Sequence, residues 1–168
     1  MRGQKMILCD RDLLSLGPQL LDPFDETLVS PASVDIRIGN HVIVESKEFI
    51  KLAIDDYSID LPMLIEPGDF ILVETLETLK VPNGYAVEMK LKSSRAREGW
   101  NHSLAFWFDP GWHGVATMEL HNVSRFQILR LYPGLRIGQI IVHRLSGDAI
   151  NPYKGKYQGA TSVEMSKE

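Results

Sequence analysis

Hydrophobic and polar residues alternate with a period of two along most of the chain after residue 30. In residues 33–39 every second position is a branched aliphatic residue, and the same pattern returns in several later segments. This period is typical of β-strands that bury one face. Glycine- and proline-containing turns separate the segments at intervals of about ten residues, which indicates an all-β barrel or sandwich. The predicted strands are 33–39 and 41–46, joined by a tight turn at Gly39-Asn40, then 69–81, 85–92, 115–123, 126–131 and 136–145.

The two ends of the chain do not share this pattern. Residues 1–5 are expected to be an extension before Met6, and Asp10 is expected to cap a short helix that ends at Gly17-Pro18. Prolines and acidic residues predict a loop over 18–31, and residues 46–65 fit no single element. The single domain is expected to span residues 6–150. The Gly-, Lys- and Ser-rich tail, 151–168, is expected to be mobile until a ligand binds.

Composition and charge narrow the class of protein. The chain has 168 residues, 44% of them hydrophobic and 24% charged, as in one globular domain. No run of about 18 apolar residues predicts a membrane span, and the N-terminus lacks the apolar region of a secretory signal, so a cytoplasmic location is expected. A net charge of −4 argues against general affinity for nucleic acid.

Metal-dependent hydrolysis has little support in the sequence. Zinc-dependent nucleobase deaminases need one His and two Cys ligands or three Cys ligands, whereas Cys9 is the sole cysteine. The five histidines lack the H-E-x-x-H spacing of zinc hydrolases, and neither common glycine-rich phosphate loop is present. We therefore expect no metal held by protein side chains, and no zinc.

Glu119 is the candidate general base. Within 115–123, alternation puts Glu119 on one face with Thr117, while Met118 and Leu120 lie on the other. If the second face is core, Glu119 points to solvent or into a cleft. A solvated strand glutamate and a shielded carboxylate suited to proton transfer both fit this pattern.

Polar residues after the predicted strand 85–92 are candidates for phosphate binding. Ser93 and Ser94 offer hydroxyl donors, and Arg95 and Arg97 offer charge-assisted donors. A capped helical turn with a charged face explains the same residues, and taken alone they favour that interpretation. Farther along, residues 109–112 read Asp-Pro-Gly-Trp, a turn, and the aromatic residues just before it can be core.

Taken together, these segments resemble the dCTP deaminases of the trimeric dUTPase-like superfamily, from Met6 onward. Ser93-Ser94 with Arg97 and Gly99 is similar to S-S-x-x-R-x-G, and residues 109–119 are similar to D-P-G-[WF]-x-G-x-x-x-x-E. Three further stretches resemble family motifs: 30–39 (SPASVDIRIG), 133–139 (PGLRIGQ) and 152–159, which contains Pro-Tyr followed by Gly-Lys-Tyr-Gln-Gly.

The resemblance implies a distorted β-barrel or jelly-roll subunit with a short N-terminal helix. It also implies a homotrimer whose active sites are shared between subunits and closed by the tail. The implied reaction is dCTP plus water to dUTP plus ammonia without zinc, with Glu119 as base and with Ser93 and Arg97 supplied by a neighbouring subunit. Mg²⁺ would enter bound to the triphosphate. The implied substrate-binding residues are Lys92, Ser94, Ala105, Asp109, Tyr153, Lys156, Tyr157 and Gln158.

Alternative activities remain open on the resemblance alone. Residues 105–111 are similar to the motif of bifunctional enzymes that also hydrolyse dUTP to dUMP, although Phe106 replaces its glycine. A plain dUTPase would carry an aspartate where this chain has Trp107. A non-catalytic nucleotide-binding regulator is a third alternative, and the joint presence of Ser93, Arg97 and Glu119 argues against it. Lys92 stands where the family usually has an arginine, and lysine cannot chelate a phosphate bidentately.

Overall fold

The computed structural model describes residues 7–103 and 105–168, so the extension expected at residues 1–5 lies outside the described residues. Strands make up most of the regular structure, and the mainly β prediction is confirmed. The elements are α1 (Asp10–Leu20), β1 (Leu21–Asp22), η1 (Glu26–Leu28), β2 (Val29–Ser30), β3 (Ser33–Val44), β4 (Ile50–Ala53), β5 (Met63–Ile65), β6 (Phe70–Lys80), β7 (Tyr85–Leu91), α2 (Ser93–Glu98), β8 (Trp100–His102), β9 (Trp107–Phe108), β10 (His113–Asn122), β11 (Leu129–Leu131) and β12 (Arg136–Arg144).

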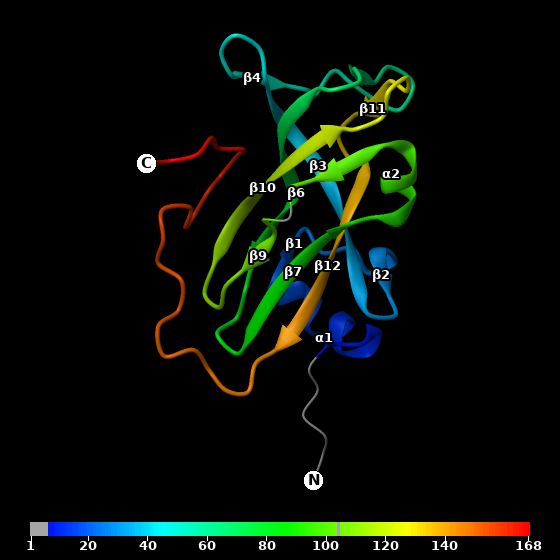
Figure 1. The fold of residues 1–168 in the computed structure, drawn as a ribbon. Helices are drawn as coiled ribbons and strands as arrows, with labels where there is room; N and C mark the ends of the chain where they lie inside the picture. The colour runs from blue at the N-terminus through cyan, green and yellow to red at the C-terminus, as the bar shows by residue number, and fades with distance from the viewer. Residues whose placement is uncertain (1–6, 104) are drawn as a thin grey trace.

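One antiparallel sheet curls around the hydrophobic core (Figure 1). Its main path runs β8-β10-β6-β3-β12-β7-β9, with β1 added to β6 and with β2 and β4 added to β3. A separate two-stranded sheet pairs β11 with β5. Because each strand alternates faces, one set of side chains fills the core and the other set faces outward. The predicted strands 69–81, 85–92, 115–123 and 136–145 correspond to β6, β7, β10 and β12.

The tight turn predicted at Gly39-Asn40 is wrong. β3 runs without interruption from Ser33–Val44, and its register with β6 shifts between Ile38 and Val42. Gly39 and Asn40 therefore lie in a bulge-like irregularity, not in a hairpin loop. A glycine inside a strand often marks such a bulge or a close approach, and here an added Cβ at Gly39 would lie 2.6 Å from Cγ of Glu74.

Helix α1 begins and ends differently from the prediction. Its N-cap is Cys9, not Asp10, and it continues through Pro18 to Leu20. Leu13, Gly17 and Leu20 are buried on one face of the helix. This buried face extends past Pro18, so tertiary packing keeps the last turn helical despite the lost backbone donor.

Two further segments, 126–131 and 46–65, have other secondary structure than the sequence pattern indicated. The strand predicted over 126–131 is shorter, since β11 comprises Leu129–Leu131 alone. Ser124 and the Asn122 side chain both donate to the carbonyl of Gln127, which bends the chain before the strand begins. The unassigned segment 46–65 contains β4 and β5.

The tail after β12 lies along β10 in this structure (Figure 1). Gly114 and Ala160 form a parallel bridge, in which Val115 N–H donates to the Ala160 carbonyl at 2.8 Å. Val163 is buried at 2% exposure against Ile43 and Leu72. Mobility of the tail in the absence of ligand stays a prediction.

No helix within residues 7–103 and 105–168 is long and apolar enough to cross a membrane.

We predict that Gly17→Ala destabilises the fold. A Cβ at Gly17 would lie 2.1 Å from Cε2 of the Phe24 ring, so the ring must leave its packed position. Such overpacking costs about 1–3 kcal/mol of unfolding free energy, which urea denaturation would measure. Ser15→Ala is the matched control, because Ser15 is exposed on the same helix. Equal stability of the two variants would contradict the assigned packing of Phe24.

Candidate active site

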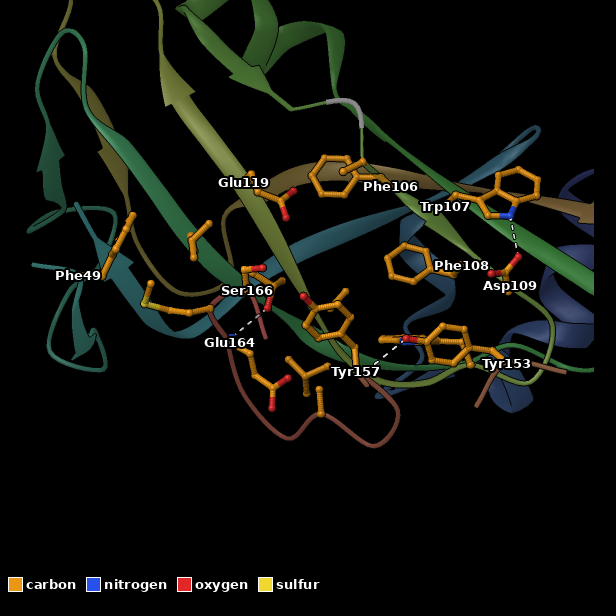
Figure 2. A pocket seen from close by; sticks show the side chains of 18 of the residues that line it. Phe49, Phe106, Trp107, Phe108, Asp109, Glu119, Tyr153, Tyr157, Glu164 and Ser166 are labelled. Atoms are coloured by element: carbon orange, nitrogen blue, oxygen red, sulfur yellow. Dashed lines mark hydrogen bonds between the residues drawn. The ribbon is translucent and has the colours of Figure 1, made fainter. Parts of the chain in front are cut away.

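A cavity of about 620 Å³ lies beside β10 and is the candidate active site. Its walls come from four parts of the chain: the β6 and β10 strands, the segment before and within β9, the loop near β4, and the C-terminal tail (Figure 2). The residues that line it are Phe49, Phe70, Leu72, Ala105, Phe106, Trp107, Phe108, Asp109, Trp112, Val115, Ala116, Thr117, Glu119, Tyr153, Tyr157, Ala160, Glu164, Met165 and Ser166.

Glu119 reaches this cavity because of the alternation along β10. Met118 and Leu120 are each 1% exposed in the core, so Glu119 points to the opposite face. The predicted assignment of the two faces is confirmed. The sequence left open whether Glu119 points to solvent or into a cleft. In the structure it lines the cavity.

The surroundings of Glu119 favour its protonated form. Burial raises the pKa of the Glu119 carboxyl above its ordinary value, against a smaller opposing effect of a backbone hydrogen bond. Oε2 is buried and has no hydrogen-bond partner among the described residues. A carboxylate with a raised pKa is a better proton acceptor than one in water, and it can return the proton readily near neutral pH.

Aromatic side chains form the wall next to Glu119. Phe106 and Trp107 lie on the side of the cavity opposite Tyr153 and Tyr157 in Figure 2. Phe108 is buried and packs at 4.8 Å between ring centroids against Trp112, whereas Trp107 is 52% exposed. The expectation that both residues before the turn are core therefore holds for Phe108 alone. Such walls suit a flat, partly apolar ring.

Asp109 lines the same cavity, as does Ala105. The Trp107 indole Nε1–H donates to Asp109 Oδ1 at 3.0 Å. The aspartate begins the turn 109–112, in which Trp112 N–H donates to its backbone carbonyl at 3.1 Å. The turn thus fixes the backbone of Asp109, and the indole holds its carboxylate.

The four predicted tail residues occupy two kinds of position. Tyr153 and Tyr157 line the cavity, and Tyr157 N–H donates to the Tyr153 hydroxyl at 3.3 Å. Gln158 and Lys156 do not line it. The Gln158 amide instead donates to the Gly111 carbonyl at 2.8 Å, and the Lys156 ammonium lies 5.5 Å from the centre of the Tyr157 ring.

The serine–arginine group lies apart from the cavity within one chain. Ser93, Ser94 and Arg97 are exposed on α2, and none of them lines the cavity. A short helical turn with a charged face is therefore present; Gly99 N–H caps its C-terminus, and Lys92 occupies the N-cap position without a capping side-chain hydrogen bond. Lys92 forms an ion pair with the buried carboxylate of Asp35. Phosphate binding by this group stays a prediction.

Two sheet residues that the sequence did not single out anchor the tail near the cavity. Glu74 on β6 accepts hydrogen bonds from Ser162 Oγ at 2.6 Å and Val163 N–H at 2.9 Å. Thr117 on β10 accepts one from Glu164 N–H at 3.0 Å. Alternation places Glu74 on the outer face of β6, but nothing local in the sequence says that the tail binds there.

No group of three or more His, Cys, Asp or Glu side chains in the described part of the chain is arranged to hold a metal ion.

Comparison with known proteins identifies similar chains. A family model described as dCTP deaminase-like matches residues 8–145. The dCTP deaminase of Pyrococcus furiosus is 40% identical over 148 residues, which cover 88% of this chain and 90% of the relative. The "dCTP deaminase, dUMP-forming" of Thermobifida fusca is 38% identical over 170 residues, covering 92% of this chain and 86% of the relative. The family resemblance inferred from the motifs is confirmed.

A solved structure supports the fold. The 2'-deoxycytidine 5'-triphosphate deaminase of Agrobacterium tumefaciens superposes with a TM-score of 0.69 at 20% identity. The match covers 83% of this chain and 48% of that one, so this chain spans about half of its length. At this identity the similarity concerns the fold, and the expected fold type is confirmed.

We predict that Glu119→Gln stabilises the ligand-free protein at neutral pH. Because the folded pKa of Glu119 is raised, its stability contribution is present below the unfolded pKa and is lost as pH rises through the folded pKa. The neutral glutamine removes that loss, so the thermal midpoint of the variant should exceed that of wild type at pH 7. The difference should disappear under acidic conditions.

Glu88→Gln is the control of opposite sign. A hydrogen bond from Lys90 lowers the pKa of the Glu88 carboxyl, so removing that charge should bring no gain in the thermal midpoint at pH 7. A gain for Glu88→Gln equal to that for Glu119→Gln would contradict the assigned burial of Glu119.

Proposed function

The chain belongs to the dCTP deaminase-like family, and from that premise we propose that it is an enzyme that hydrolyses dCTP to dUTP and ammonia. The observation that carries the proposal is the position of Glu119. It is a partly buried carboxylate with a raised pKa in an aromatic-walled cavity, and it completes the motif that begins at Asp109. The cavity volume of about 620 Å³ is large enough for a nucleotide-sized ligand.

The proposed reaction uses Glu119 twice. Its carboxylate takes a proton from a water molecule, and the resulting hydroxide attacks C4 of the cytosine ring. The protonated Glu119 then passes its proton to the departing 4-amino group, which leaves as ammonia, while the proton of the new C4 hydroxyl moves to N3 and C4 becomes a carbonyl. Burial favours this exchange because it brings the proton affinity of the carboxylate closer to that of the reacting groups.

Ala105 and Asp109 are proposed to contact the base and sugar, together with Tyr153. The support is their common position on the cavity wall. The indole of Trp107 orients the Asp109 carboxylate, so that this acceptor is available to a sugar hydroxyl without first reorganising. The aromatic residues beside them exclude water from the reacting ring.

Ser93 and Arg97 are proposed to reach this cavity from a neighbouring copy in a homotrimer. Two features of the single chain support this. Glu119 Oε2 is unpartnered among the described residues, and α2 lies outside the cavity. An exposed hydrophobic side chain adjoins α2: Val123 is 51% exposed, and its N–H donates at 2.9 Å to the carbonyl of Gly99, the C-cap residue of α2. Phe126, three residues later in the chain, is 86% exposed. Exposed apolar surface of this kind is typical of subunit interfaces.

Ser94 and Lys92 are proposed to contact the triphosphate, as are the tail residues Lys156, Tyr157 and Gln158. Binding by Lys92 or Gln158 requires them to release or share their present partners, Asp35 and the Gly111 carbonyl. Mg²⁺ is proposed to arrive on the phosphate oxygens, where it would neutralise their charge.

Hydrolysis of the product to dUMP is a second candidate activity. Its support is the similarity to the Thermobifida fusca relative, which is named dUMP-forming. A comparable identity to the Pyrococcus furiosus dCTP deaminase leaves the choice to experiment.

We predict that purified protein releases ammonia from dCTP with Mg²⁺, and that Glu119→Gln lowers kcat by about 10²–10⁴-fold, the usual contribution of a general acid–base residue. Ammonia release measured at saturating dCTP would test this. Glu26→Gln, an exposed carboxylate on η1, is the matched control for loss of one negative charge. Undiminished turnover by Glu119→Gln would refute the mechanism, and inactive wild type would refute the function.

Chromatographic separation of dCTP, dUTP and dUMP during the same reaction decides between the two activities. We expect dUTP to accumulate in step with ammonia. Appearance of dUMP and pyrophosphate without accumulating dUTP would establish the bifunctional alternative. A chelator selective for zinc should leave the rate unchanged, since no step uses that ion.

Shared sites predict complementation between two inactive variants. Co-expression of Arg97→Ala with Glu119→Gln should create sites that combine an intact Glu119 with an intact neighbouring Arg97. Random assembly of a ring of identical subunits makes such sites about a quarter of the total. Activity of the mixed protein no higher than that of either variant alone would contradict sharing.

A further inference from the structure

Glu74 is a buried carboxylate that uses both oxygens to join three segments of the chain. Oε1 accepts from Asn40 N–H at 3.0 Å and lies 2.8 Å from His41 Nδ1, both on β3. Oε2 accepts from Ser162 Oγ and Val163 N–H of the tail. Burial raises the pKa of Glu74, but the hydrogen bonds, led by those from Ser162 and His41, outweigh it and hold the pKa below its ordinary value. The site is therefore built for a charged carboxylate.

The irregularity in β3 makes room for this carboxylate. A Cβ added to Gly39 would lie 2.6 Å from Cγ of Glu74. A larger residue at this position would therefore displace the Glu74 side chain. The register shift between Ile38 and Val42 frees the Asn40 N–H to bond Glu74 instead of a neighbouring strand. The binding site for the tail is thus formed by β3 and β6, with the Glu74 carboxylate held in place by the Asn40 N–H.

Apolar packing and further hydrogen bonds reinforce the attachment. Val163, at 2% exposure, covers Ile43 and Leu72 on the outer face of the sheet. Lys51 Nζ donates to the Val163 carbonyl at 3.2 Å. One residue later, Glu164 N–H donates to Thr117 Oγ1 on β10.

The tail runs parallel to β10 and to the turn before it, so that successive tail residues bond successive residues there. Tyr153 N–H bonds the Pro110 carbonyl, Gly159 N–H bonds that of His113, and Ala160 pairs with Val115 further along. Tail residues 157, 160 and 164–166 then form one wall of the cavity that holds Glu119 (Figure 2). In the β6–β10 register, Glu74 is opposite Thr117, two residues from Glu119.

We propose that Glu74, Ser162 and Val163 form a tail latch that closes the tail over the Glu119 cavity of its own subunit. Glu74 is a positioning residue in this arrangement, since it acts on the reaction through the tail. The catalytic consequence rests on the proposed deaminase function, whereas the docking of the tail does not. A cavity would then combine its own tail with α2 of a neighbouring copy.

Hydrogen–deuterium exchange of the nucleotide-free protein tests the docking directly. Ser162→Ala removes one hydrogen bond to Glu74, and Thr161→Ala removes an exposed hydroxyl one residue away. We expect exchange in the peptide covering residues 160–166 to rise about tenfold for Ser162→Ala, as for the loss of a hydrogen bond to a charged group. Thr161→Ala should match wild type. Equal exchange in all three proteins would overturn the latch.

Glu74→Gln provides a second variant that preserves size. A glutamine has one acceptor oxygen, so it cannot accept from both β3 and the tail. We expect faster exchange in residues 160–166, with exchange in β10 unchanged. Unchanged exchange in the tail would contradict the role assigned to this carboxylate.

Kinetics separate a failed latch from a failed function. We expect Ser162→Ala to raise the KM for dCTP severalfold with a smaller change in kcat, because a lid that opens more easily binds substrate less well. Thr161→Ala should keep both parameters. If wild type turns over no dCTP, the proposed function fails while the exchange result still decides the latch. Identical kinetics of Ser162→Ala and wild type would refute the link between the latch and the site.

Mixed assembly tests closure by the same subunit. Val163→Asp places a charge in the buried contact and should lower kcat/KM at least about tenfold by detaching the tail. Co-expression of Val163→Asp with Glu119→Gln should restore no activity, because each cavity then lacks either its base or its tail. The Arg97→Ala and Glu119→Gln pair is the positive control for mixed assembly. Recovery with Val163→Asp would show closure by a neighbouring tail and overturn the proposal.

Discussion

The antiparallel pairing of β10 with β6 places Glu119 opposite Leu72 and Thr117 opposite Glu74 on the outer face of the sheet. The inner face of the same pair carries Met118 and Val73 in the core. A slip of one residue would exchange these faces and bury the carboxylates among aliphatic side chains. The free energy of core burial therefore holds the catalytic candidate and the tail anchor in one register, side by side.

The two carboxylates on this face have opposite surroundings. Glu74 receives hydrogen bonds on both oxygens, and these outweigh the effect of burial on its pKa. Glu119 has an unpartnered buried oxygen among the described residues, and burial raises its pKa. One carboxylate is thus suited to remain charged and hold a structure together, and the other to exchange a proton. Glu74 and Glu119 lie on neighbouring strands, and the number of hydrogen bonds that each carboxylate accepts distinguishes their roles.

The walls of the cavity come from parts of the molecule that differ in stability. The aromatic wall and Glu119 belong to a sheet with a continuous core, whereas the tail is attached by a few hydrogen bonds and one buried valine. Segments with few apolar contacts open at lower free energy than the core does. In the proposed latch, this arrangement would let the wall stay preorganised while the tail admits the substrate and then covers it.

The sequence by itself determined the mainly β class, the positions of β6, β7, β10 and β12, the outward face of Glu119 and the family. Each follows from local alternation or from ordered motifs, which survive without knowledge of distant contacts. Phe108 and Trp107 illustrate where this ends, because both are aromatic but only one is buried. Their different burial depends on what packs against each.

Only the tertiary structure decided the course of α1 past Pro18, the unbroken strand at Gly39-Asn40 and the seat of the tail on Glu74. Glycine followed by asparagine favours a turn locally, yet the neighbouring strand β6 supplies a carboxylate that bonds the freed backbone N–H. Glu74 lies 34 residues away from Asn40 and 88 from Ser162, so no short window contains the interaction. Contacts between residues far apart in sequence, through packing and hydrogen bonding, overruled the local preference.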